Sequence, residues 1–240
     1  MPILRAMRLF NAIEANEFTA ATLEALLADA GRRNDLDAVT ADRALMHRLA
    51  QTQAAAAVVL GSALGRASVF ASTVAMEALC ASRLGRDAVF NTPAVLAALV
   101  ASPVGMGTLG ESVICKMQLS VSAPALTAVA GSATALTALR GCSQYGVVTV
   151  TGNYGVAVPF TMPGESYIML GVSQNVAQNT TVTMQTILAS GSGATTFIGS
   201  SDGTGTSATT KAAAVTLQAP FSAMRSSNST TYHGLLRCDI

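Results

Sequence analysis

The chain has no tryptophan, and aromatic residues account for only 5% of its 240 residues. Charged residues are also scarce, at 11%, whereas hydrophobic residues reach 50%. So few charges do little to keep chains apart in solution, and we expect an obligate oligomer. The formal net charge is +1, and no basic cluster exists beyond Arg32 and Arg33, which argues against a nucleic-acid partner.

Cysteine is rare, and its four positions follow no metal-ligand spacing, so we expect neither a metal nor another cofactor. Cys80 and Cys115 fit small buried hydrophobic residues. Cys142 and Cys238 bracket the last hundred residues. They are a candidate disulfide pair if this part of the chain meets an oxidising exterior.

A ten-residue repeat runs from Asp42 to Gly141. Every tenth residue is Ser, Thr or Asp: Asp42, Thr52, Ser62, Ser72, Ser82, Thr92, Ser102, Ser112, Ser122 and Ser132. Side-chain oxygens of these types accept hydrogen bonds from the first turn of a helix. Pro93 and Pro103, each directly after such a residue, favour the same position because the first helical N–H needs no partner. The column predicts ten helix N-caps.

An aliphatic residue follows each of these positions by seven: Leu49, Val59, Val69, Leu79, Val89, Leu99, Leu109, Leu119, Val129 and Leu139. The residue four after the cap is often Met or Leu, which places both on one helix face. Each repeat is therefore a short helix and a turn. Such helices are marginal alone, so stacked neighbours or partner chains must bury this core. LeuGlyArg recurs at 64–66 and 84–86, which suggests a two-helix unit.

Three alternatives explain parts of this pattern. A continuous coiled coil would need about 3.5 residues per turn, and the prolines of the array would break it. A parallel β-solenoid is favoured by apolar residues five apart, such as Leu64 and Val69, but Ala, Leu and Met prefer helix. A membrane segment is suggested by the uncharged stretch 117–139, which Pro124 interrupts.

Residues 1–41 do not follow the repeat and hold much of the chain's charge. Thr19 can cap a helix over 20–27, and residues 30–35 are interpreted as the turn by which the chain leaves that helix. We interpret 1–41 as a helical N-terminal domain, either an anchor or base, or a cap over the open end of the array. The array itself, 42–141, is the second domain.

The third domain, 142–240, alternates polar and β-branched residues. Strands are predicted at 147–150, 156–160, 167–172, 181–188, 214–218 and 232–236. This pattern predicts an antiparallel β-sandwich or jelly-roll-like head. The Gly/Ser-rich tract 190–207 is interpreted as a turn-rich connection between strands, with a mobile surface loop at 201–205. Its SerAspGlyThrGly at 201–205 lacks the acidic repeats of a calcium loop and the lysine of a phosphate loop.

An enzyme is not expected. His47 lies in the first repeat, where a surface or packing role is ordinary. His233, Cys238 and Asp239 are the residue types of a base, a nucleophile and an orienting group, so a Cys/His hydrolase is a remote alternative. No nucleophile signature surrounds Cys238. The N-terminus also lacks a long apolar export stretch, so synthesis without export is expected.

Three segments carry a resemblance to a known family: STVAMEALCA at 72–81, TPAVLAALVA at 92–101 and SATALTALRG at 132–141. They resemble the Ser-x-x-Ala-Met/Leu-x-Ala-Val/Leu-x-Ala repeats of tailed-bacteriophage virion fibre proteins. The opening RLFNAIEANEFTAATLEALLA, residues 8–28, is similar to N-termini that precede such repeats. The resemblance covers roughly residues 8 to 141.

The resemblance implies a structural virion protein, in a head, collar or tail fibre or appendage, assembled in the host cytoplasm. It implies a homotrimeric, supercoiled stalk over 42–141 and attachment to another virion protein through 1–41. The last domain, 142–240, would then cap the stalk or bind a host-surface glycan or protein. Four residues after the cap, where Met or Leu is common, three repeats carry a charged residue instead: Arg66, Arg86 and Lys116. Each of these side chains should either lie along the core with only its charged end at the surface, or face outward altogether.

Overall fold

The structure is a computed structural model that describes residues 2–151, 157–159, 166–175, 180–188, 195–203, 208–211, 215–218, 221–225 and 230–239. The chain divides into two compact units, residues 1–128 and 129–240, and each unit is described by itself. The first unit is wholly helical, and the second combines a helix with antiparallel strands.

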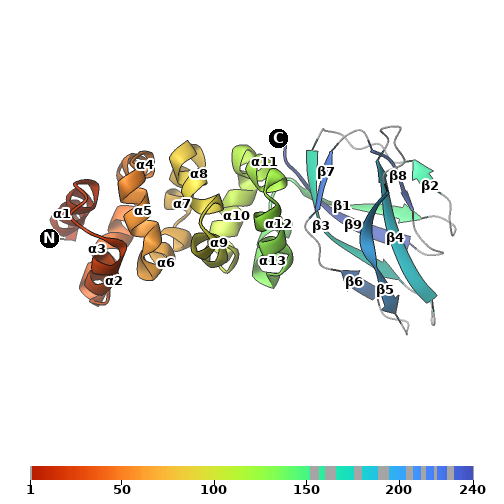
Figure 1. The fold of residues 1–240 in the computed structure, drawn as a ribbon, viewed down its shortest axis with the longest axis horizontal. Helices are drawn as coiled ribbons and strands as arrows, with labels where there is room; N and C mark the ends of the chain where they lie inside the picture. The colour runs from red at the N-terminus through yellow and green to blue at the C-terminus, as the bar shows by residue number, and fades with distance from the viewer. Residues whose placement is uncertain are drawn as a thin grey trace. The chain divides into compact units, whose positions relative to one another are not determined.

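Ten helices of eight or nine residues follow the ten-residue repeat (Figure 1). They are α4 (Arg43–Gln51), α5 (Gln53–Gly61), α6 (Ala63–Ala71), α7 (Thr73–Ala81), α8 (Arg83–Phe90), α9 (Pro93–Val100), α10 (Pro103–Glu111), α11 (Val113–Val121), α12 (Ala123–Ala130) and α13 (Ala133–Arg140). The prediction of repeated short helices and turns is confirmed, and neither a continuous coiled coil nor a β-solenoid forms here.

Three further helices precede the repeat: α1 (Pro2–Glu14), α2 (Ala20–Leu27) and α3 (Ala30–Thr40). Thr19 caps α2 as expected, through a reciprocal pair of hydrogen bonds with Thr22. The interpretation of 30–35 as the turn by which the chain leaves α2 is wrong, because these residues form the first half of α3. Asp29 begins that helix by accepting a hydrogen bond of 2.9 Å from the backbone N–H of Arg32.

From α2 to α10, helices of the first unit pack against the third helix along the chain. Helix α7 contacts both α4 and α10, and the pairs α5/α8, α6/α9, α2/α5 and α3/α6 follow the same rule. The cause is the turn: α5 and α6 are bent by 103°, and α9 and α10 by 97°, so three bends bring the chain back over an earlier helix. The repeating layer is therefore three helices and thirty residues, and the two-helix unit is wrong.

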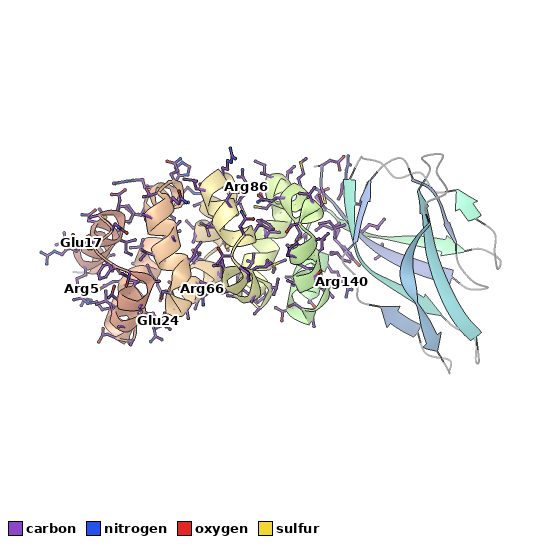
Figure 2. The ribbon with its side chains drawn as sticks, viewed as in Figure 1. Arg5, Glu17, Glu24, Arg66, Arg86 and Arg140 are labelled. Carbon is purple, nitrogen blue, oxygen red and sulfur yellow. The ribbon has the colours of Figure 1, made fainter. Side chains whose placement is uncertain are left out.

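Side chains between the layers form the core of the first unit (Figure 2). The N-terminal helices share in it, since Phe10, Ile13 and Leu36 are fully buried. Arg48 of α4 reaches back to α1, where its guanidinium bonds to Glu14 at 2.5 Å and lies 5.0 Å from the ring centroid of Phe10. Residues 1–41 therefore continue the stack and cover its first layer.

The second unit carries strands in two hydrogen-bonded groups. The strands are β1 (Tyr145–Thr151), β2 (Ala157–Pro159), β3 (Ser166–Asn175), β4 (Thr180–Leu188), β5 (Thr195–Gly203), β6 (Ala208–Lys211), β7 (Val215–Gln218), β8 (Phe221–Arg225) and β9 (Thr230–Arg237). The orders are β1-β9-β3-β6, with β7 also on β3, and β2-β8-β4-β5. Every described pairing is antiparallel, as predicted.

The interpretation of 190–207 as a turn-rich connection is wrong over 195–203, and the loop at 201–205 is wrong over 201–203. This stretch is β5, which pairs with β4 from Thr195 to Gly203. The β-branched and aromatic residues Thr195–Ile198 favour a strand, and their effect outweighs the glycines and serines that follow. Ser201 to Gly203 thus belong to a strand, and the other two residues of the SerAspGlyThrGly segment lie outside the described residues.

Helix α13 packs on β1, β3 and β9 within the second unit. Leu139 of the helix and Ile168 and Leu236 of the strands are fully buried, and Arg140 donates to the carbonyl of Leu170. The last helix ends at Arg140 and the first strand begins at Tyr145, on either side of the predicted domain boundary.

Within the described ranges, no single helix is long and apolar enough to cross a membrane. Three bent pairs, α5/α6, α9/α10 and α11/α12, meet the length and composition criteria only when both helices are counted together.

Candidate functional site

The ten predicted cap residues each precede a helix of the array. Eight of them accept a side-chain hydrogen bond from the first turn: Asp42, Ser62, Ser72, Ser82, Ser102, Ser112, Ser122 and Ser132. Thr52 and Thr92 form no such bond. The Thr52 hydroxyl instead donates to the carbonyl of Arg48 at 3.2 Å, in the preceding helix.

The ten aliphatic residues, from Leu49 to Leu139, are all buried, with at most 3% of each side chain exposed. For the first unit, the layers of one chain supply this burial. At roughly 1.5–3 kcal/mol for a fully buried aliphatic side chain, the column is a major source of the array's stability. Burial of the core therefore needs no partner chain.

The cap hydroxyls also connect successive layers. Ser72 donates to the carbonyl of Thr40 at 2.7 Å, Ser82 to Ala50 at 2.6 Å, and Ser102 to Phe70 at 2.7 Å. Each donor lies 32 residues after its acceptor, so a turn of one layer bonds to the end of a helix in the layer before it. One hydroxyl thus satisfies an N–H of its own helix and a carbonyl of another.

Two arginines donate hydrogen bonds to carbonyls at the ends of the helices α5 and α7. Arg66 donates to Leu60 at 2.8 Å and Arg86 to Cys80 at 2.6 Å, each six residues earlier (both arginines are labelled in Figure 2). A cation at a helix C-terminus is favourable, because the last carbonyls carry partial negative charge. Both side chains are half-buried, whereas Lys116 is fully buried. For Lys116 both predicted alternatives are wrong, because its side chain neither faces outward nor reaches the surface.

Helix α11 differs from its neighbours on its outer face. Ile114, Met117 and Val121 are 53%, 52% and 74% exposed and lie along one side of the helix. The residues at the place of Met117 in the other nine helices are His47, Ala57, Ala67, Glu77, Asp87, Ala97, Gly107, Thr127 and Thr137. Those at the place of Val121 are Gly, Ala, Gln, Asn or Glu. An exposed apolar helix face of this kind marks an interaction surface.

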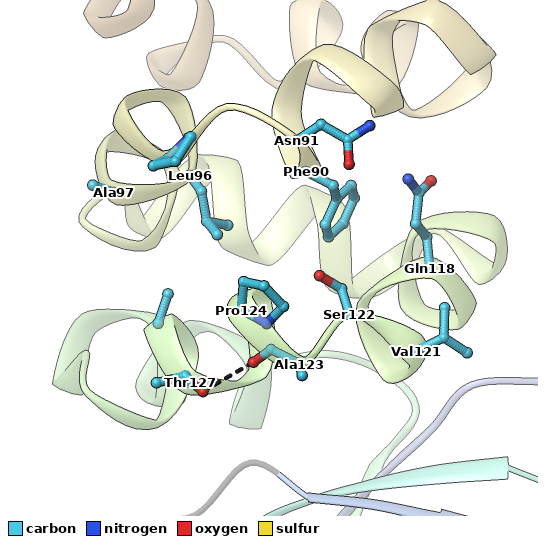
Figure 3. Close-up of a pocket in the computed structure, with 12 residues that line it drawn as sticks. Phe90, Asn91, Leu96, Ala97, Gln118, Val121, Ser122, Ala123, Pro124 and Thr127 are labelled. Carbon is cyan, nitrogen blue, oxygen red and sulfur yellow. Dashed lines mark hydrogen bonds between the residues drawn. The ribbon is translucent and has the colours of Figure 1, made fainter.

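A groove adjoins this face within the first unit (Figure 3). It has a volume of about 920 Å³ and lies between the turn at Phe90–Asn91 and the turn at Val121–Ser122. Its walls are largely apolar, with Leu96 and Pro124 among the lining residues. Ser122 follows Phe90 by 32 residues, yet no hydrogen bond joins them in the described structure. The groove therefore lies where the 32-residue pattern would place a hydrogen bond between two layers.

The four cysteines are all buried. The Cys80 and Cys115 thiols both line one small cavity, and each shifts the pKa of the other. Cys142 and Cys238 occur as thiols, which donate to the carbonyls of Ala138 at 3.5 Å and Leu236 at 3.7 Å. A backbone hydrogen bond between Arg237 and Gln144 holds their two segments together. The Cys142–Cys238 disulfide stays a prediction.

The residues of the remote hydrolase alternative have other contacts. Asp239 accepts from Arg237 at 2.9 Å, a contact that raises the pKa of the arginine. The His233 side chain lies outside the described residues. His47 is exposed and its ring bonds to the Gln51 side chain at 2.9 Å. Among the described residues, no three His, Cys, Asp or Glu side chains gather as metal ligands.

Sequence reasoning missed the α11 face and the groove. The signal for the face was present, because aligning the ten repeats shows Ile, Met and Val together in α11 alone. The groove carried no such signal, since it depends on the 32-residue contact between layers. Compared with known protein families, the chain matches no family model, and no curated protein matches it either.

Proposed function

We propose that this chain is a non-enzymatic structural protein of a tailed-bacteriophage virion, forming a homotrimeric fibre or appendage. Residues 1–41 attach it to another virion protein, and the strands of the second unit form a β-sandwich head. The observation that carries this proposal is the array itself, in which ten short helices follow one repeat and the caps Ser72, Ser82 and Ser102 bond both within and between layers. Such a regular stack suits a spacer or support.

The structure changes the physical basis on which a trimer rests. The aliphatic column is satisfied inside one chain, so chains must meet through outer surfaces. The α11 face, made of Ile114, Met117 and Val121, is the best candidate for that contact. At the places of Met117 and Val121, the other helices carry small or polar residues. Its burial between copies would remove apolar surface from water.

Met117→Asp tests this mode of assembly. A carboxylate at the centre of the face should convert the trimer into a monomer, because desolvating an unpaired charge in the contact is costly. Molar mass by light scattering gives the result, and circular dichroism checks that the helices remain. Ala67→Asp, at the equivalent exposed position of α6, should stay trimeric. A wild-type chain that is a compact monomer would overturn the proposal.

A host-surface binding role for residues 142–240 is the second candidate. It is favoured by the division of the chain, which gives the strands a compact unit separate from most of the array. Particles that carry the chain without 142–240 should then lose adsorption to host cells. Unchanged adsorption would assign the strands a capping role instead.

A further inference from the structure

Two buried thiols from different layers of the array meet at one small cavity. Cys80 lies near the end of α7 and Cys115 in the first turn of α11, and they are 5% and 1% exposed. Both line an enclosed space of about 10 Å³, together with Arg86, Phe90 and apolar side chains. The two thiols are close enough that each shifts the pKa of the other. They are neighbours in the fold although a full layer of helices separates them in sequence.

The stacking of layers explains this meeting. Cap hydroxyls of the array approach the residue 32 positions earlier, as Ser82 approaches Ala50. Ser112, the cap of α11, lies 32 residues after Cys80, and its hydroxyl interacts with both thiols. The regular register between layers therefore brings the end of α7 against the first turn of α11.

The two thiols have different acidities. The interaction with Cys80 lowers the pKa of Cys115, and the Ser112 hydroxyl and the Arg86 charge act in the same direction against burial. The same interaction and burial raise the pKa of Cys80. Cys115, in a helix first turn beside an arginine, is thus the thiol that ionises first and attacks a disulfide.

Phe90 separates this cavity from the groove. Phe90 is 7% exposed and lines the groove (Figure 3), and it also lines the thiol cavity. A small molecule in the groove would reach the sulfur atoms when this side chain moves aside.

We propose that Cys80 and Cys115 are an oxidisable pair, which small organic disulfides entering past Phe90 convert into a disulfide between α7 and α11. The Cys115 thiolate attacks one sulfur of the reagent, forms a mixed disulfide and releases one small thiolate. Cys80 then loses its proton and displaces the second small thiolate from Cys115. Two protein thiols are oxidised, one reagent disulfide is reduced to two thiols, and these take up the two protons.

The bond would fasten two layers of the array. It closes a loop through α8, α9 and α10, which limits the unfolded chain, and we expect the thermal midpoint to rise by roughly 5–15 °C. The array would then be more stable in an oxidising exterior than inside a cell. This inference does not depend on the proposed virion function.

The test uses the full-length folded chain and 2-hydroxyethyl disulfide at neutral pH. After alkylation under unfolding conditions, peptide mapping should find Cys80 linked to Cys115. Cys115→Ser should leave Cys80 alkylated, and Cys80→Ser should stop at the mixed disulfide on Cys115. The proposal is overturned if wild-type Cys80 and Cys115 both remain alkylated, or if Cys80 pairs with Cys142 or Cys238.

Phe90→Ala tests the route of entry. It should speed formation of the bond by about tenfold, because the side chain that closes the cavity is removed. Phe70→Ala is the matched control, since Phe70 holds the same repeat position, is 2% exposed and lines neither space. Equal acceleration in both variants would show entry by general unfolding and reject the route. Phe90→Leu gives the same comparison with a smaller loss of packing.

Discussion

Two turns of the array carry the same sequence pattern and differ in structure. At the first, Ser82 is 8% exposed, accepts from Gly85 at 3.2 Å and donates to Ala50 in the preceding layer. At the second, Ser122 accepts weakly from Ala125 at 3.4 Å and faces a groove where a layer contact would otherwise lie. We call the first turn closed, because it is hydrogen-bonded to the preceding layer, and the second turn open, because a groove lies there instead.

The turns that follow Ala50 and Phe90, which lie opposite Ser82 and Ser122, differ in length. Helix α4 runs to Gln51, and the single residue Thr52 separates it from α5. Helix α8 ends at Phe90, so two residues separate it from α9. The longer turn between α8 and α9 leaves the turn at Ser122 without a hydrogen bond to the preceding layer in the described part of the chain. Functional surfaces of a repeat protein can therefore arise where the period is kept and one contact is lost.

Leu99→Asp should have the largest effect, because Leu99 is fully buried. A carboxylate there has no partner, and we expect a loss of about 4 kcal/mol or more in the free energy of unfolding. Urea unfolding followed by circular dichroism measures it. Thr127→Asp, at an exposed position of α12, should change stability by less than about 0.5 kcal/mol. Similar losses in both variants would contradict the buried role of the column.

Ser82→Ala and Ser122→Ala compare the two turns directly. Loss of the Ser82 hydroxyl removes a cap and leaves the Ala50 carbonyl without its layer bond, which should cost about 1–3 kcal/mol. Ser122→Ala removes only a weak cap and should cost less than about 1 kcal/mol. Thermal unfolding of the two variants side by side gives the ranking. Equal costs would mean that the second turn is closed in solution.

At the turn around Ser62, the carboxylate of Glu24 accepts the hydrogen bond that a helix-end carbonyl accepts at Ser72, Ser82 and Ser102. Its carboxylate accepts from the Ser62 hydroxyl at 2.5 Å and from the Leu64 N–H at 3.0 Å, which lowers its pKa below the usual 4.5. This contribution to stability is present above about pH 4.5 and is lost as the pH falls through the lowered pKa. Glu24→Gln should flatten that part of the stability profile, whereas the exposed Glu17→Gln should not. Identical profiles for all three proteins would exclude the contact.

The positions of the helices could be predicted from the sequence, but the way in which they stack could not. Periodic Ser and Thr predicted where α4 to α13 begin, because capping is a local interaction within three residues. The 32-residue bonds, the buried Lys116 and the groove depend on the bend at each turn, which no local pattern specifies. The same reasoning failed at α3 and β5, where Gly, Asn and Ser suggested breaks. In both places packing or pairing outweighed the local preference.

Gly107→Ala gives the smallest effect and tests the open side of the array through its backbone. Gly107 lies inside α10, and an added Cβ would meet no atom within 4 Å. Alanine restricts the unfolded chain and favours the helix, so stability should rise by about 0.5–1 kcal/mol. Gly105→Ala, two residues earlier, places its Cβ 2.8 Å from Cδ1 of the buried Leu99 and should lower stability instead. Urea midpoints that shift in opposite directions would confirm that one face of α10 is packed against the preceding layer and the other is open.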